Sequence, residues 1–294
     1  MEPTNSYEIH PKENFYFIIK VIVSALVYFS MGYFLFFAEI PVIGYTKYLF
    51  FFYAIVIALV LLFQFGILIG YIKGNAVKVN ETQFSDIYAT VVKQSTALGL
   101  SYVPDVYLLQ AGGLLNAFAT RFFGRNYIVI YSDVLEEAYE DNKAAVDFII
   151  GHELGHIKRN HLTKNLILFP SAFMPFLNAA YSRACEYTCD SIGACLSPQG
   201  AQQGLLLLAA GKRLYKKVNI DSYVAQTYQE GGFWKWFAEK VSTHPNLTKR
   251  LEKFNYKSFQ TASKPLTIVD EVKQEAATKR NRPQQILPKL VNVL

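Results

Sequence analysis

The sequence predicts an α+β protein in which an N-terminal hairpin of two transmembrane helices precedes a mainly helical domain with a small β-sheet. Two observations lead to this prediction. The first 75 residues contain two long apolar stretches, and the rest alternates short β-prone segments with amphipathic helical ones. The 294 residues are 52% hydrophobic and 18% charged, whereas an ordinary soluble chain is roughly a quarter charged. This composition excludes disorder, collagen and coiled coil for most of the chain.

The two apolar stretches are long enough to cross a membrane. Residues 15–38 carry Lys20 as their only charge, and residues 48–72 carry none. A spanning helix needs about 20 apolar residues to cover a hydrocarbon core of ~30 Å, so we interpret residues 1–75 as a transmembrane hairpin. We expect Lys20, near the start of the first span, to extend its side chain back to the headgroups. A cleaved signal peptide fits poorly, because the first apolar run is too long and a second one follows at once.

The lysines that flank the hairpin predict its orientation. Lys12 precedes it and Lys73, Lys78 and Lys93 follow it, whereas the turn contains only Lys47. The positive-inside rule then places both termini, and the domain after the hairpin, in the cytoplasm. We therefore expect an integral protein of the cell (inner) membrane.

Charge and cysteine content restrict the remaining classes of function. The net charge of +6 is modest and scattered, and without a basic face we expect no nucleic-acid partner. Cys185, Cys189 and Cys195 are an odd number in one short segment, which makes no disulfide framework and suits a reducing compartment. An ion or solute carrier is disfavoured, because two spans with a single charge offer no pathway.

Residues 76–260 have the composition of a globular domain, and residues 261–294 have that of a polar, loosely held tail. Capping signals open one helix at Asp133 and a longer one at Asp141 or Asn142. The spacing of apolar residues predicts further elements. They are helices over 81–95 and 204–215 and strands over 106–110, 115–123 and 127–131.

The strongest chemical signal is the motif HELGH at residues 152–156. Histidines four residues apart lie on one face of a helix, so His152 and His156 can chelate one Zn²⁺. Glu153 beside them can take a proton from the attacking water. The alternative is a solvated or core helix that contains the pattern by chance. A catalytic zinc has three protein ligands and one open position, so a third ligand is required downstream.

Glu186 is the candidate third ligand. Asp190, one turn further along the same helix, can accept from the outer N–H of a ligating histidine. Cys185 and Cys189 are the rivals, because two thiolates could complete a site with four protein ligands. Such a site is structural and would leave the glutamate of the motif without a role. We expect one Zn²⁺ per chain with three protein ligands: His152, His156 and Glu186.

With these residues in place, the chain resembles the HtpX-like and CAAX-prenyl-protease-like membrane zinc endopeptidases of the gluzincin group. The resemblance covers about residues 84–250 together with the hairpin, and it depends on four motifs in the right order. They are Asn116-Ala117-Phe118-Ala119, the HELGH helix, Glu186 with Asp190, and Thr243-His244-Pro245 followed by Arg250. The resemblance implies a zincin-type metalloprotease domain with zinc as cofactor, protein or peptide substrates, and no small-molecule cofactor.

Two of these motifs would act on the substrate. The segment from Asn116 to Ala119 resembles the edge strand to which an extended substrate adds by main-chain hydrogen bonds. The alternative is an ordinary edge strand with a buried Phe118. Attack on a peptide carbonyl creates an oxyanion, and of the five histidines His244 remains as its donor. The alternative is a histidine that caps a helix over 246–254.

The chain departs from the family between the motif and Glu186. Members of the HtpX type usually have two further spans there, whereas only 29 residues, 157–185, separate the two sites here. Residues 165–182 lack charge, but a single crossing would put His156 and Glu186 on opposite faces of the bilayer. We therefore expect a buried connection or an interfacial loop that dips and returns.

Two other features complete the prediction. His161 lies about 140° around the helix from His156, so we expect a surface or capping histidine. Trp234 and Trp236 are the only tryptophans, and we expect them at the membrane interface, with burial in the core as the alternative.

Together these residues predict a membrane-anchored, zinc-dependent endopeptidase that hydrolyses peptide bonds of protein substrates in the quality control of membrane proteins. The alternative is a membrane-anchored zinc-binding protein without proteolytic turnover. Glu153 disfavours this alternative, because a protein that only binds zinc needs no general base.

Overall fold

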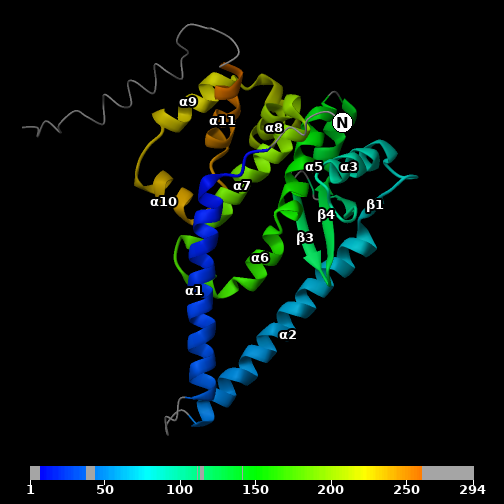
Figure 1. Cartoon of the computed structure of the whole chain (residues 1–294). Coiled ribbons are helices and arrows are strands. Elements are labelled where there is room, and N and C mark those ends of the chain that lie inside the picture. The colour runs from blue at the N-terminus through cyan, green and yellow to red at the C-terminus, as the bar shows by residue number, and fades with distance from the viewer. Residues whose placement is uncertain (1–6, 38–43, 111, 113–115, 141, 260–294) are drawn as a thin grey trace, which may run out of the picture.

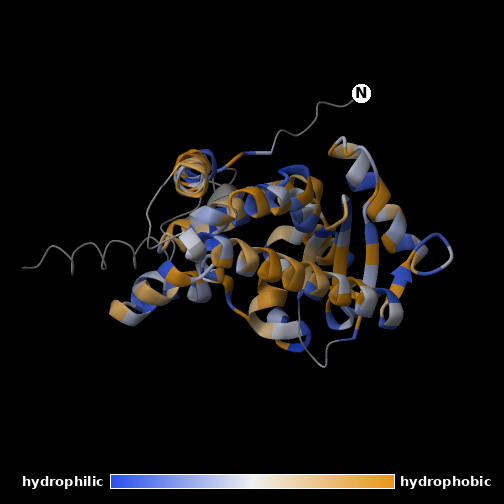
Figure 2. Cartoon of the chain, turned by 90° about the horizontal axis from the view of Figure 1, so that it is seen from below, coloured by the Kyte–Doolittle hydropathy of each residue, from blue (hydrophilic) through white to orange (hydrophobic). Residues whose placement is uncertain are grey.

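The computed structural model describes residues 7–37, 44–110, 112, 116–140 and 142–259. Its N-terminal part consists of two long helices, α1 (Pro11–Phe36) and α2 (Gly44–Asn75), which converge at one end and diverge towards the domain (Figure 1). In the most apolar stretches of α1 and α2, only 11% and 6% of the residues are buried. Figure 2 shows the hydrophobic residues of these helices from below. Helices this long, apolar and exposed fit membrane spans rather than the core of a soluble protein.

A mixed β-sheet lies between α2 and the helices of the domain (Figure 1). The strand order is β1-β2-β4-β3, with β2 and β4 parallel and the outer strands antiparallel to their neighbours. Successive residues of a strand face opposite sides, so Ile128 packs into the main core while Val129 packs with Ile69 of α2. The sheet thus fixes the end of α2 to the domain. The strands are β1 (Val77–Val79), β2 (Asp105–Leu109), β3 (Ala117–Phe122) and β4 (Arg125–Tyr131).

The rest of the domain is helical, and two of its helices pack along each other at the centre. The fully buried side chains of Ile150 and Leu154 from one of them and Ile192 from the other join the main core. The first two helices are α3 (Ser85–Ala97) and α4 (Ser132–Glu140), and the central pair is α5 (Lys143–Lys158) and α7 (Leu177–Leu196). The others are α6 (His161–Ile167), α8 (Ala201–Leu214), α9 (Ile220–Gln229), α10 (Phe233–Val241) and α11 (Leu247–Phe259), with short 3₁₀ turns at Phe169–Phe173, Pro198–Gly200 and Tyr215–Lys217.

Most predicted elements are present close to their predicted positions. The predicted start of the long helix at residue 142 is confirmed: Asn142 precedes α5, and its side chain accepts from the backbone N–H of Ala145 at 3.2 Å. α3 begins later than predicted because Asn80 Oδ1 accepts the backbone N–H groups of Thr82 and Gln83 and turns the chain. The three-residue strand β1 was missed, since it is too short to show a period. The predicted tail over 261–294 lies outside the described residues.

Polar side chains tie α1 to the domain. The buried residues of α1 are Glu13, Lys20 and Ser24. Lys20 Nζ donates to Asn165 Oδ1 at 3.0 Å and to Asn178 Oδ1 at 2.7 Å. The prediction that Lys20 reaches the headgroups is therefore wrong, because amide oxygens from α6 and α7 supply its partners inside the protein.

The two tryptophans lie on the surface of the domain. No residue of α10 is buried, and the side chains of Trp234 and Trp236 are 77% and 53% exposed. The alternative that they belong to the core is therefore wrong. Their location at the membrane interface stays a prediction.

Candidate active site

The two histidines of the motif lie on the inner face of α5. Because they are one turn apart, their rings point the same way. Their Nε2 atoms are 3.3 Å apart, with His152 buried and His156 partly buried. Ile150 and Leu154 are fully buried on the same helix and fix its rotation against the core.

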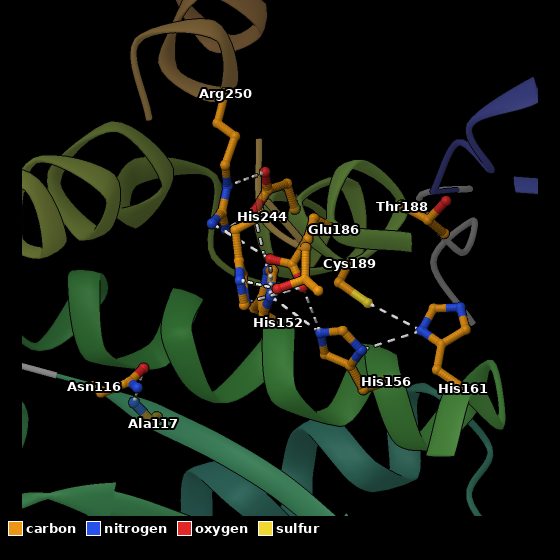
Figure 3. Close-up of polar contacts among 12 residues, drawn as sticks. Asn116, Ala117, His152, His156, His161, Glu186, Thr188, Cys189, His244 and Arg250 are labelled. Atoms are coloured by element: carbon orange, nitrogen blue, oxygen red, sulfur yellow. Dashed lines mark hydrogen bonds and ion pairs between the residues drawn. The ribbon is translucent and has the colours of Figure 1, made fainter. Parts of the chain in front are cut away.

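Glu186 of α7 completes the group (Figure 3). Its Oε2 lies 3.4 Å from His152 Nε2 and its Oε1 lies 3.3 Å from His156 Nε2. With zinc bonds of about 2.0–2.1 Å, tetrahedral ligand atoms are about 3.3–3.4 Å apart, since a tetrahedron's edge is about 1.6 times its centre-to-corner distance. The separation of the two nitrogens and that of each nitrogen from its nearer Glu186 oxygen are close to this value, and one ligand atom from each residue lies within 4.8 Å of the others. The three residues therefore fit a zinc site.

The close approach of α5 and α7 requires glycine at their contact. A Cβ on Gly155 would lie 3.2 Å from the Cα of Cys189, and a Cβ on Gly193 would lie 2.8 Å from the backbone oxygen of Phe148. Larger residues would push the helices apart. The glycines therefore allow Glu186 to reach the histidines.

A buried ion pair lies behind His152. Asp190 Oδ1 is 3.0 Å from His152 Nδ1 and can accept its proton. Arg250 of α11 donates to both oxygens of Asp190, at 2.8 and 2.6 Å, and its Nη1 lies 3.4 Å from Glu186 Oε2. Burial alone would raise the pKa of Asp190, but Arg250 and His152 hold it below its usual range. The carboxylate therefore stays ionised.

The outer nitrogen of His156 faces a second histidine. His161 is buried; its Nδ1 lies 3.2 Å from His156 Nδ1, and its Nε2 lies 3.2 Å from Glu13 Oε1. Arg159 donates to the same oxygen of Glu13 from Nε at 3.0 Å and Nη2 at 2.8 Å. The prediction of a surface or capping histidine is wrong. The chain turns at Asn160, where φ is 55°, so the angle extrapolated along α5 no longer applies.

The cysteines lie beside this second histidine. Cys189 Sγ is 3.7 Å from His161 Nδ1. Burial raises the pKa of the Cys185 and Cys189 thiols, which fits buried side chains that stay protonated when no metal is bound. The described residues contain two groups of possible ligands that include a thiol: His156, His161 and Cys189, and Glu13, His161 and Cys185. The group without a thiol is the better zinc site.

The other predicted residues line a cavity together with His152, His156 and Glu186. Glu153 lines the cavity from α5, and β3 lines it from the edge of the sheet. Phe118 is half-buried, with its ring 6.1 Å from that of Tyr131. The predicted residues that line the cavity are Asn116, Ala117, Phe118, Ala119, His152, Glu153, His156, Glu186 and His244.

His244 reaches the cavity from the turn between α10 and α11. Its Nε2 lies 3.6 Å from Glu186 Oε1, and its side chain is mostly exposed. Arg183 of α7 holds this turn by donating to three backbone carbonyl groups at the end of α10, at 2.7, 2.9 and 2.7 Å. Arg183 was not among the residues predicted from the sequence. Its position three residues before Glu186, on the same side of α7, was the available signal.

Two histidines of a helical HExxH motif and a glutamate from a second helix define the class of HExxH zinc metallopeptidases. The sequence profile of Peptidase family M48 matches residues 81–177 and 167–258. These ranges cover more than half of the chain and every residue of the predicted site. The chain therefore belongs to this family and is a zinc metalloendopeptidase with protein or peptide substrates. The predicted family and enzyme class are confirmed.

Among solved structures, the crystal structure of S. mikatae Ste24p is similar, with a TM-score of 0.44 and 14% sequence identity. The match covers 84% of this chain and 67% of that chain. A search of curated proteins gave no match.

Proposed function

We propose that His152, His156 and Glu186 hold one zinc ion per chain and that Glu153 is the general base. The observation that carries this proposal is the convergence of His152, His156 and Glu186, whose ligand atoms lie within 4.8 Å of one another. Zinc in such a site acidifies water and polarises a peptide carbonyl. Asp190 accepts from His152 Nδ1 and so directs Nε2 of the same ring at the metal.

Glu153 carries out the proton transfers. Its carboxylate takes the proton from the attacking water, so that free hydroxide does not have to form. It then gives this proton to the leaving amine, which therefore does not have to leave as an anion. The substrate lies in extended form along the outer edge of β3, between Asn116 and Ala119, through main-chain hydrogen bonds. The position of β3 at both the edge of the sheet and the wall of the cavity supports this role.

His244 stabilises the oxyanion of the transition state. Its Nε2 lies 3.6 Å from Glu186 Oε1, and the residue lines the same cavity as the three ligands. A hydrogen-bond donor at the developing negative charge stabilises the transition state. The rigid Pro245 that follows it and the carbonyl groups held by Arg183 keep its backbone in place.

The domain faces the cytoplasm, because Lys73, Lys78 and Lys93 lie on its side of the hairpin. The exposed Trp234 and Trp236 rest at the membrane surface, where indole rings are favoured. A reporter fused after residue 294 that is active only on the outer side would contradict this orientation.

Zinc content tests the ligand set. Glu186→Ala removes one of only three ligands, so the purified variant should lose most of its zinc, measured by elemental analysis. Cys185→Ser is the matched control, since it changes the neighbouring residue of the same helix and should keep the metal. Retention of zinc by the first variant and its loss in the second would transfer the third position to the thiol.

The substrates are membrane proteins undergoing quality control. This proposal is supported by the two candidate membrane spans and by the cavity in the domain that is attached to them. A comparison of protein fragments in cells that carry the wild type or Glu153→Gln tests the proposed substrates. If the fragments that depend on Glu153 come only from soluble proteins, the proposal is wrong.

A further inference from the structure

The segment 166–177, which runs from the last turn of α6 to the first residue of α7, has an apolar surface that the domain does not cover. The sequence has no charged residue from 165 to 182. The side chains of Leu166 and Phe173 are 76% and 78% exposed, and those of Ile167 and Phe169 are 58% and 54% exposed. Exposed apolar side chains gathered on one loop need a partner other than water.

Hydroxyl groups of α1 fix this segment beside the middle of the first span. Tyr28 Oη donates to the carbonyl oxygen of Ile167 at 2.9 Å, and Ser24 Oγ donates to that of Leu168 at 3.3 Å. At 1.5 Å per residue, Ser24 and Tyr28 lie about 14 and 20 Å along the helix from residue 15, where we place the start of the span. Figure 1 shows α6 descending obliquely from the domain towards α1, with the following turn beside α1. The segment therefore lies at the depth of the hydrocarbon core.

Several polar groups of the segment have partners within the protein. Pro170 and Pro175 have no N–H to satisfy. The carbonyl oxygen of Leu168 also accepts from Ser171 Oγ at 2.6 Å and from its backbone N–H at 3.1 Å. Non-helical backbone is tolerated at membrane depth only where it is buried in the protein or lines a water-filled cavity, and Pro170 and Ser171 of this turn are buried.

Lys20 ties together the two ends of the segment. Its ammonium group binds the amide of Asn165 before the segment and that of Asn178 after it. A cation in a span that is held inside the protein by polar partners has a structural or functional role. Here it closes a loop that enters and leaves on the same side.

We propose that residues 166–177 form a re-entrant loop whose apolar side chains insert into the lipid acyl chains beside α1. Of the two sequence-based alternatives for this connection, the contacts favour the loop that dips and returns. The lipid is the occupant because the apolar surface of the loop continues that of α1, whose outward residues Leu26 and Phe29 are 61% and 74% exposed. The inference depends on α1 as a membrane span and not on the catalytic roles proposed above.

Depth-dependent fluorescence quenching tests this. The full chain with Trp234→Phe and Trp236→Phe would carry one new tryptophan, Leu166→Trp, in phosphatidylcholine vesicles with brominated acyl chains. Leu26→Trp is the membrane control, since it lies on α1 between the two residues that bind the loop. Leu214→Trp, 59% exposed at the end of α8, is the aqueous control. Zinc content and thermal unfolding verify that each variant is folded.

The proposal expects Leu166→Trp to be quenched by brominated lipid as strongly as Leu26→Trp and to be shielded from aqueous acrylamide. Quenching by acrylamide as for Leu214→Trp would overturn it, because the loop would then lie in water. Shielding from both quenchers would also overturn it, because another protein surface would then cover the loop. Phe173→Trp repeats the measurement if Leu166→Trp does not fold.

Discussion

At the residue scale, the two histidines that we propose as zinc ligands differ in the partner of the ring nitrogen that faces away from the metal position. Asp190 accepts from His152, whereas the nitrogen of His156 meets His161 at 3.2 Å. With Nε2 of His156 directed at the metal, its Nδ1 carries the proton and donates to His161, whose Nε2 then donates to Glu13. Through these contacts, Glu13 of α1 would orient one of the proposed zinc ligands.

The series of hydrogen bonds from His156 through His161 to Glu13 predicts an effect on zinc affinity. His161→Phe keeps the size of the ring but removes the acceptor for His156, so zinc affinity should fall by about 10–100-fold. Competition with a chelator measures it in the purified protein. His10→Phe is the control, because His10 stacks on Tyr187 with ring centroids 5.1 Å apart and contacts no ligand. Equal affinities in both variants would show that the contact does not position His156.

His244 makes a separate prediction about the rate. His244→Ala should lower kcat by roughly 10²–10³, the usual cost of one oxyanion donor, with zinc content and thermal stability nearly unchanged. Its exposed side chain makes a large loss of stability unexpected. If the variant instead loses stability and its folded fraction turns over at the wild-type rate, His244 is structural.

At the scale of the elements, the contact between α5 and α7 decides the geometry of the site. Gly193→Ala brings a methyl group within 2.8 Å of the backbone oxygen of Phe148. We expect a loss of stability of about 1–3 kcal/mol and weaker zinc binding as Glu186 moves away. Gly74→Ala in α2 is the control, because its added Cβ meets nothing within 4 Å. Denaturant unfolding compares the two variants; equal stabilities would contradict the close contact.

The helices and the ligand spacing were predictable because they follow from local patterns. The spacing of four residues puts His152 and His156 on one face of a helix. The capping side chain of Asn142 marks the residue directly before α5. Contacts between distant segments were not predictable. Glu13 and His161 are 148 residues apart in sequence, and neither shows its partner in the surrounding residues. The prediction that Lys20 reaches the headgroups was wrong for the same reason, since its amide partners come from α6 and α7.

At the scale of the whole molecule, the hairpin and the domain are joined at both helices. Glu13 and Lys20 of α1 bind Arg159, which directly follows α5, and residues of α6 and α7, while Ile69 and Ile72 of α2 pack in the cluster beneath the sheet. The cavity is thereby held at a fixed place above the diverging ends of the two spans. The hairpin is part of the support of the active site as well as a membrane anchor.

Hydrolysis of an unfolded protein substrate by zinc-loaded Glu153→Gln tests the central claim most directly. The amide is nearly the same shape as the carboxylate but accepts no proton, so the variant should keep its zinc and its thermal stability and lose cleavage. A general base contributes typically about 10²–10⁴-fold to the rate. Activity within about tenfold of the wild type would contradict the role of Glu153 and the mechanism built on it.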